Sequence, residues 1–164
     1  MPKKIGSGRP PQSPLKRWFF RAPIKLYSAG MGWLLGGRFM LLEHRGRRSG
    51  LPRQTVIEVV KHISHPAPAR YYACSGYGEH SDWFKNLRAH PEVRITLGRR
   101  TRAATARVLP ANEAGLLMLD YAQRYPRTAR ALVRACGYEV DGTDADWRAI
   151  GDTDMRFIES GVQQ

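Results

Sequence analysis

The sequence predicts an α+β barrel with helices inserted between its strands. From Phe39 onward, six segments rich in β-branched and other apolar residues are separated by Gly- and Pro-containing turns. Helical patterns fall at a few points between these segments. Because the strands do not alternate regularly with crossover helices, a Rossmann fold is disfavoured. The 164 residues are enough for one domain with a sizeable core.

The expected strands follow one another with clear turn signals between them. The basic segment from Gly46 to Pro52 separates the first two strands, and the loop 62–69 separates the second from the third. Gly98 marks a hairpin between the fourth and fifth. The six strands are expected at residues 39–45, 53–61, 70–76, 92–98, 101–109 and 154–160.

Four helices are expected between these strands. Ser81 is suited to cap a helix over 81–90, which Pro91 ends. Asn112 is suited to cap a helix over 112–125. On that helix the spacing of Leu116, Leu119 and Ala122 predicts a shared buried face. A third helix, 128–137, stops at Gly137, and Thr143 with Asp146 forms a capping box for a fourth, 144–150.

The first 38 residues are expected to precede the barrel domain, 39–164, as a basic tail and a helical segment. Residues 1–14 are rich in Pro, Gly, Lys and Ser and predict a mobile tail. In residues 15–37 Pro23 breaks any helix, and the apolar part is too short to span a bilayer. We expect this segment to pack across the barrel. A basic amphipathic segment lying on a membrane surface is the alternative.

Positive charge is concentrated in the first third of the chain. The formal net charge is +13, and residues 1–53 carry twelve Lys and Arg but one acidic residue. Such a balance favours an anionic partner: a nucleic acid, a membrane surface or a polyanionic small molecule. No nucleic-acid-binding motif is present, and the arginines cluster at one turn rather than along a stripe. We therefore expect a small-molecule ligand and no nucleic acid.

The chain lacks the motifs of metal, nucleophilic and nicotinamide chemistry. The two cysteines form no CxxC pair, and the five histidines are scattered, so no metal site is expected. The cysteine usage and the lack of a secretory signal favour the cytoplasm. We therefore expect that a bound organic cofactor supplies the reactive centre.

The segment Gly46–Arg53 is the first candidate site. Two glycines allow a tight turn with exposed N–H groups, and Arg47, Arg48, Ser49 and Arg53 surround it. Guanidinium groups form bidentate bonds to phosphate oxygens, so this turn is a chemically sensible phosphate cradle. A solvated hairpin turn with charged flanks is the alternative interpretation.

Further candidates follow the third strand. Ser75, Gly76 and Tyr77 end it with small residues that permit close approach to a flat ring. On the next helix Trp83 and Asn86 lie beside each other, and a mid-helix Asn needs a hydrogen-bonding partner. Each of these also fits an ordinary turn or core position.

Two phenols are candidate proton donors. Tyr121 and Tyr125 lie four residues apart and share a helix face, and a phenol can donate a proton to a reduced substrate. The alternative is an aromatic stripe in the core. Together with Ser75 and Tyr77, they are the expected catalytic residues.

These motifs, in this order, resemble the deazaflavin-dependent nitroreductase family of split-β-barrel flavin and deazaflavin oxidoreductases. The resemblance runs from about Phe39 to Leu109. It rests on G-R-R-S-G-x-P-R after a strand, S-G-Y-G at a strand end, and S-D-W-F-K-N-L-R-A-H-P-E-V. It implies an FMN-binding-like split barrel and a cytoplasmic reductase, often dimeric, that reduces activated double bonds, quinones or nitro compounds.

The resemblance also implies a cofactor and a set of ligands for it. Family members bind coenzyme F-420, an 8-hydroxy-5-deazaflavin with a phosphate-bearing, oligoglutamate tail. By similarity, the phosphate and tail contact the arginine turn, the deazaflavin lies along Ser75, Gly76 and Tyr77, and Trp83 and Asn86 support the ring. An FMN-dependent barrel and a non-enzymatic cofactor or lipid carrier remain as alternatives.

The sequence departs from the nitroreductase members of that family at two places. They carry a Lys where Gly76 stands, and a substrate-side Tyr is not matched near Thr128. We therefore expect weak activity on bulky nitroimidazoles.

Overall fold

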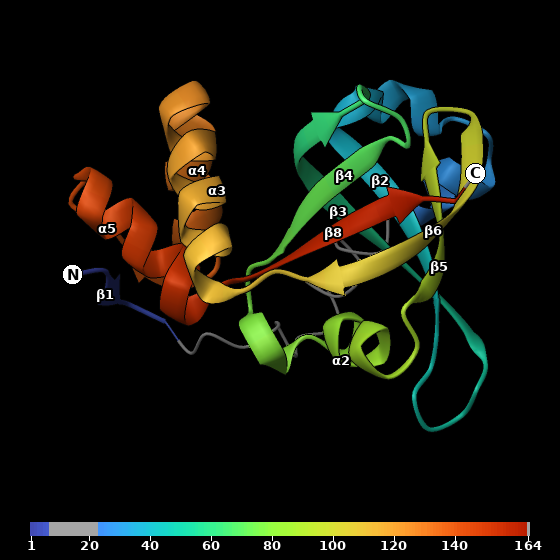
Figure 1. The fold of residues 1–164 in the computed structure, drawn as a ribbon, viewed down its shortest axis with the longest axis horizontal. Helices are drawn as coiled ribbons and strands as arrows, with labels where there is room; N and C mark the ends of the chain where they lie inside the picture. Colours follow the sequence, from blue (N-terminus) through green and yellow to red (C-terminus); the bar gives the residue numbers. More distant parts are fainter. Residues whose placement is uncertain (7–22, 164) are drawn as a thin grey trace.

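A closed barrel of six antiparallel strands forms the centre of the molecule (Figure 1). The computed structural model describes residues 1–6 and 23–163. Strand order around the barrel is β2-β3-β4-β8-β6-β5, so β8, the last strand of the chain, lies between β4 and β6 and joins the β2–β3–β4 strands to the β5–β6 hairpin. The predicted α+β barrel with inserted helices is confirmed. Its strands are β2 (Phe39–Arg45), β3 (Pro52–Ile63), β4 (Arg70–Ser75), β5 (Glu92–Leu97), β6 (Arg100–Val108) and β8 (Arg156–Val162).

Apolar side chains on alternate strand positions fill the barrel. Met40 and Leu42 on β2 point inward, as do Tyr71 and Ala73 on β4, in keeping with the period of two. Hairpin turns need glycine at Gly50 and Gly98, whose φ angles are +67° and +58°. The interior core is therefore set by the same alternation that predicted the strands.

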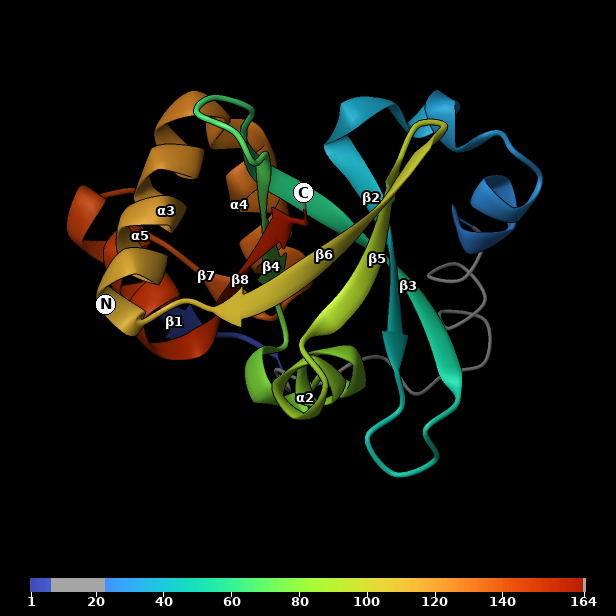
Figure 2. The same ribbon diagram turned by 45° about the vertical axis from the view of Figure 1, so that its right-hand side comes forward.

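The helices lie on three parts of the barrel surface, with η1 apart from the other two groups (Figures 1 and 2). α3, α4 and α5 pack on one side, where a second apolar core joins them to the outward face of β3, β4 and β8. α2 lies across one end. The helices are η1 (Gly32–Arg38), η2 (Gly78–His80), α2 (Asp82–Ala89), α3 (Ala111–Arg124), α4 (Pro126–Ala135), α5 (Asp144–Ala149) and η3 (Ile150–Asp154).

Helix caps follow the sequence signals in part. Thr143 Oγ1 accepts a hydrogen bond from the Asp146 N–H at 3.2 Å, which confirms Thr143 as the cap of α5. The prediction that Asn112 caps α3 is wrong. The helix begins one residue earlier, at Ala111, so Asn112 is its second helical residue and no side chain bonds at that cap.

Of the three residues predicted to share the buried face of α3, Ala122 is buried and Leu119 packs against the core, but Leu116 is 51% exposed. Leu117, Met118 and Tyr121 are buried in addition. Gly115 also lies on this face, because a Cβ there would lie 2.9 Å from the Arg148 carbonyl oxygen and would collide with Asp152. The missing side chain lets α3 approach α5 and η3 through its backbone.

The N-terminal residues do not form a free tail as far as they are described. Lys3–Lys4 (β1) pairs with Tyr138–Glu139 (β7), so the expected mobility is wrong for residues 1–6. Residues 7–22, including most of the basic part of 15–37, lie outside the described residues. Residues 23–28 are helical, and the Tyr27 hydroxyl donates to the Phe39 carbonyl at 2.8 Å. No helix in the described part of the chain has the length and apolar character to cross a bilayer.

Candidate active site

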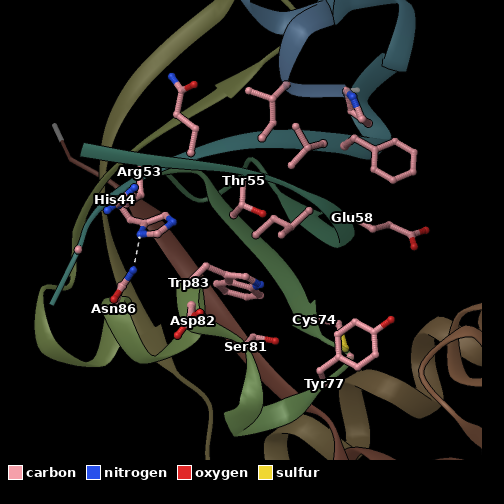
Figure 3. Close-up of a pocket in the computed structure, with 18 of the residues that line it drawn as sticks. His44, Arg53, Thr55, Glu58, Cys74, Tyr77, Ser81, Asp82, Trp83 and Asn86 are labelled. Atoms are coloured by element: carbon pink, nitrogen blue, oxygen red, sulfur yellow. Dashed lines mark hydrogen bonds between the residues drawn. The ribbon is translucent and has the colours of Figure 1, made fainter. Parts of the chain in front are cut away.

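A cavity of about 830 Å³ lies on the outer face of the barrel (Figure 3). It is bounded by the β2–β3 hairpin, the end of β4, the first half of α2, the last turn of α4 and the start of the helix at residues 23–28. Its volume falls in the range of small-molecule and cofactor sites. Arg53, His44 and Asn86 lie at one end, Glu58, Cys74 and Tyr77 at the other, and Trp83 between them.

The predicted arginine turn forms the first end of this cavity. Arg47, Arg48, Ser49 and Arg53 all line it. The turn is closed by hydrogen bonds from the Gly46 N–H to the Leu51 carbonyl, at 2.9 Å, and from the Gly50 N–H to the Gly46 carbonyl, at 2.8 Å. A Cβ on Gly46 would lie 2.7 Å from Ser49 Oγ, so the turn is tight only because glycine stands there.

Positive charge exceeds negative charge at this end. The Arg47 guanidinium pairs with Asp82 at 3.1 Å. Arg48 and Arg53 form no ion pair within residues 1–6 and 23–163. Guanidinium groups that lack a carboxylate partner and line a cavity suit an anionic ligand. We call this part, with His44 and Asn86, the cationic end.

Asn86 ties the turn to α2. Its Oδ1 accepts from the Arg47 backbone N–H at 3.1 Å and from Arg47 Nη1 at 3.0 Å. Its Nδ2 lies 3.2 Å from His44 Nδ1. The side chain is buried, so these contacts account for the mid-helix Asn that the sequence singled out. Trp83, also predicted, lies along the cavity and meets Phe84 edge-on.

The opposite end is less charged and contains thiols and a phenol. Gly76 and Tyr77, both predicted, line it beside Cys74 and Cys136. A Cβ at position 76 would collide with Cys136 Sγ, so glycine is needed there for the packing of α4. Burial raises the pKa of the Cys136 thiol to about 12 and also raises the pKa of the Tyr77 hydroxyl, so both stay protonated at neutral pH. We call this part the apolar end.

Glu58 is held at the wall of the apolar end by two groups. Arg38 Nη2 lies 3.0 Å from Glu58 Oε1, and the Tyr121 hydroxyl donates to the same oxygen. Tyr121 is buried and does not line the cavity itself. Its burial, followed by the Glu58 hydrogen bond, raises the pKa of its hydroxyl well above the usual range. Tyr121 therefore acts on the cavity only through Glu58.

Besides Tyr121, two of the predicted residues, Ser75 and Tyr125, do not reach the cavity. Ser75 is buried, and its hydroxyl donates to the Gly78 carbonyl at 2.9 Å and lies 2.8 Å from Ser81 Oγ. Strand alternation turns Ser75 to the same side as Tyr71 and Ala73, away from the cavity. Tyr125 is half exposed at the end of α3, where Arg124 stacks on its ring.

The predicted site residues do not include several residues that line the cavity, among them His44, Glu58, Cys74 and Cys136. Glu58 carried a readable signal, since it is a lone acid in the apolar run T-V-I-E-V-V. His44 stands two residues before the arginine turn. No group of three residues in the described ranges could hold a metal ion.

His44 stays neutral over the physiological range. Burial lowers its pKa to about 4, a backbone contact with Arg45 works in the opposite direction, and the positive charge of Arg53 lowers it further. The unfolded chain therefore binds a proton here between pH 6.5 and pH 4, and the folded chain does not. Because the unfolded state holds more protons in this window, stability falls as pH falls through it.

We expect the protonation of His44 to be visible in the free energy of unfolding measured below pH 6.5. The free energy of unfolding of the wild type should drop by about 1.5 kcal/mol more than that of His44→Phe between pH 6.5 and pH 5. Urea unfolding at both pH values measures the difference. An equal drop in the two proteins would show that the His44 pKa is not lowered.

Comparison with known proteins identifies the fold and the family of the chain. No curated protein matches the chain. A solved structure described as an F420-H2 dependent reductase (FDR-A) has 19% identity and a TM-score of 0.50, over 77% of this chain and 94% of that one. A conserved hypothetical protein of Mycobacterium tuberculosis has 14% identity and a TM-score of 0.54, over 99% of this chain and 87% of that one. These similarities establish the fold.

A structure described as a domain-swapped dimer also has this fold. It is 19% identical, with a TM-score of 0.52, over 92% of this chain and all of that one. The family model of the F420H(2)-dependent quinone reductase matches residues 20–134, which include the arginine turn, the end of β4 and all of α2. Because this match spans well over half of the chain, the protein belongs to the F420H(2)-dependent quinone reductase family.

Proposed function

We propose that the cavity holds the deazaflavin cofactor with its phosphate and tail at the cationic end, and a quinone at the apolar end. Membership of the family makes the protein a reductase that uses coenzyme F-420. The observation that carries the assignment of the two ends is the separation of charge within one cavity. Arg47, Arg48 and Arg53 line one end, and a largely apolar wall lines the other.

The residues at the cationic end fit an anionic cofactor tail. Arg48 and Arg53 offer guanidinium groups without a carboxylate partner in the described part of the chain. Ser49, which also lines the cavity, adds a hydroxyl. Phosphate and carboxylate oxygens accept strong charge-assisted hydrogen bonds from such donors. The cavity volume of about 830 Å³ leaves room for a planar ring beyond them.

The chemistry divides between the cofactor and the chain. When bound, the reduced deazaflavin supplies a hydride, and the protein orients the acceptor and excludes water. Hydride transfer to a quinone leaves a hydroquinone anion, which takes up one proton to become the hydroquinone. Of the tyrosines in the described residues, Tyr77 is the one that lines the cavity. Its raised pKa keeps the hydroxyl protonated, so it donates a hydrogen bond to the acceptor oxygen.

Binding and turnover together test this proposal. Titration of the purified protein with oxidised coenzyme F-420, followed by fluorescence, should give tighter binding than a parallel titration with FMN. The reduced cofactor should be oxidised fastest by quinones, more slowly by enones, and weakly by bulky nitroimidazoles. Equal or tighter FMN binding would contradict the cofactor assignment. Tight F-420 binding without turnover of any acceptor would indicate a carrier.

Tyr77→Phe should lower kcat with a quinone about tenfold and leave the F-420 dissociation constant unchanged. The effect falls below the usual range for a general acid because the reduced quinone oxygen is only weakly basic. Stopped-flow oxidation of the reduced cofactor measures it. Tyr125→Phe is the matched control, since Tyr125 lies outside the cavity. An unchanged kcat in Tyr77→Phe would leave solvent as the proton donor.

We further propose that the protein is cytoplasmic and contacts anionic membranes through the segment 15–37. In the described part of this segment, Met31, Trp33 and Leu34 are exposed, with Arg38 nearby in sequence. Exposed aromatic and aliphatic side chains beside basic residues suit a lipid interface. Trp33→Ser/Leu34→Ser should abolish co-sedimentation with anionic vesicles at unchanged melting temperature. Absence of wild-type co-sedimentation would support packing on the barrel alone.

A homodimer is the assembly we propose. Support comes from one structural neighbour, which is described as a domain-swapped dimer. Light scattering coupled to gel filtration should give twice the monomer mass of 18.6 kDa. A monomer at working concentrations would contradict it.

A further inference from the structure

We propose that His44 is an uncharged hydrogen-bond donor to the phosphate group bound at the cationic end. Asn86 fixes the orientation and the tautomer of its imidazole ring. This inference rests on the proposed function, since the ligand is the phosphate-bearing tail of the cofactor. It assigns a binding role to a residue that the motif of arginines and serine does not include. The role follows from a chain of three contacts, from Arg47 through Asn86 to His44.

The first step fixes the orientation of the Asn86 carboxamide. Both groups of Arg47 that contact it, the backbone N–H and Nη1, are donors without accepting capacity. The atom they share must therefore be the amide oxygen. The amide nitrogen then faces His44 Nδ1 at 3.2 Å. The opposite orientation would place an NH₂ group against two donors.

The second step fixes the tautomer of His44. An amide nitrogen can only donate, so Nδ1 must accept and carries no proton. The proton of the neutral ring then lies on Nε2. The edge of the imidazole opposite Asn86 points into the cavity, toward the space between Thr55 and Trp83 (Figure 3). The ring thus presents an N–H group to whatever occupies the cationic end.

The surrounding charges favour the neutral form. In the β2–β3 pairing His44 stands directly opposite Arg53, so the two side chains share a face. Arg47 lies on the other side of Asn86, and its partner Asp82 is mostly exposed. A third positive charge beside these two guanidinium groups is unfavourable, and burial disfavours it further. The site therefore combines charged donors with one donor that adds no charge and does not titrate near neutrality.

Direct observation of the tautomer is the first test. Long-range ¹H–¹⁵N spectra of ¹⁵N-histidine-labelled protein should show His44 with the proton on Nε2 between pH 6 and pH 8. The Nε2 resonance should shift on addition of oxidised F-420, and no proton should be taken up. An Nδ1–H ring donating to the Arg45 carbonyl, or a charged ring in the complex, would overturn the inference.

Binding to variants is the second test. His44→Phe keeps an aromatic ring but removes the donor, and should weaken binding of oxidised F-420 about tenfold. His44→Gln supplies an amide N–H to the ligand and an acceptor to Asn86, and should stay within about threefold of wild type. His62→Phe is the matched control. His62 stacks on Tyr71 at 4.5 Å and lines a different cavity at one mouth of the barrel, so its removal should change nothing.

The outcomes separate this inference from the proposed function. If the wild type fails to bind F-420, the proposed function fails. If the wild type binds and His44→Phe binds equally well, only the role of His44 fails. Equal losses in His44→Phe and His44→Gln, with an intact fold by circular dichroism, would also contradict a donor role, because the amide should restore the bond.

Discussion

Removal of both Arg47 and Arg48 is expected to weaken the binding of oxidised coenzyme F-420 about a thousandfold. Each guanidinium that bonds a phosphate or carboxylate oxygen contributes roughly 1.5–3 kcal/mol, and the double variant Arg47→Ala/Arg48→Ala removes two. Arg47 should account for the larger share, because its loss also removes the Nη1 bond to Asn86 Oδ1 and leaves only the backbone N–H of position 47 to hold the carboxamide that contacts His44. Fluorescence titration of the two single variants and the double variant measures each step.

A pair of arginines elsewhere on the surface provides the control. Arg127→Ala/Arg130→Ala removes the same charge from exposed positions of α4 that do not line the cavity. It should alter binding only through long-range attraction, by a factor that disappears in high salt. The double variant of the turn should keep its melting temperature, since Arg48 is exposed and Arg47 is only partly buried. Equal losses in the two pairs would mean that general charge, rather than the cradle, holds the cofactor.

Gly76→Ala is expected to destabilise the fold by about 2–3 kcal/mol and to distort the apolar end of the cavity. The added methyl group would collide with Cys136 Sγ and approach Met155 Cε to 3.3 Å. Both neighbours are buried members of the core under α4, and overpacking of this kind carries such a cost. Urea unfolding measures the change. Quinone turnover should fall more than F-420 affinity, because the arginine turn is at the far end.

A double-mutant cycle with Cys136→Ala makes this prediction specific. Cys136→Ala alone should cost about 1 kcal/mol through the loss of a buried sulfur. Combined with Gly76→Ala it should restore part of the lost stability, since the sulfur that the methyl group meets is gone. The coupling free energy is expected at about 1–2 kcal/mol. Additive effects of the two substitutions would rule out the steric contact as the cause.

The strands and the arginine turn could be predicted because their signals are local. Runs of β-branched residues bounded by turn residues predict β3 and the β5–β6 hairpin. The candidate phosphate-binding residues of the turn Gly46–Arg53 lie almost consecutively in the sequence. Asn86 was recognisable for a similar reason, since an Asn in the middle of a helix needs a partner. In each case the sequence signal lies in the same residues that form the strand, turn or contact.

The remaining site residues depend on which face of an element meets the cavity. Ser75 and Cys74 are neighbours on β4, and a shift of one position decides which of them lines the site. The sequence around them contains small residues on both faces, so it favoured the wrong one. The buried face of α3 similarly includes the close approach at Gly115, a contact with residues more than thirty positions later. Such pairings become visible only in three dimensions.

The two thiols in the cavity wall matter for the resistance of the protein to alkylation by quinones. Quinones are electrophiles that alkylate cysteine, and the species they attack is the thiolate. Burial raises the pKa of Cys136 to about 12 and that of Cys74 well above its usual range, so almost no thiolate exists at neutral pH. A quinone bound at the apolar end, as proposed above, would thus approach both sulfur atoms during turnover without forming a covalent adduct. The burial that packs α4 against the barrel would in this way protect the catalyst from inactivation.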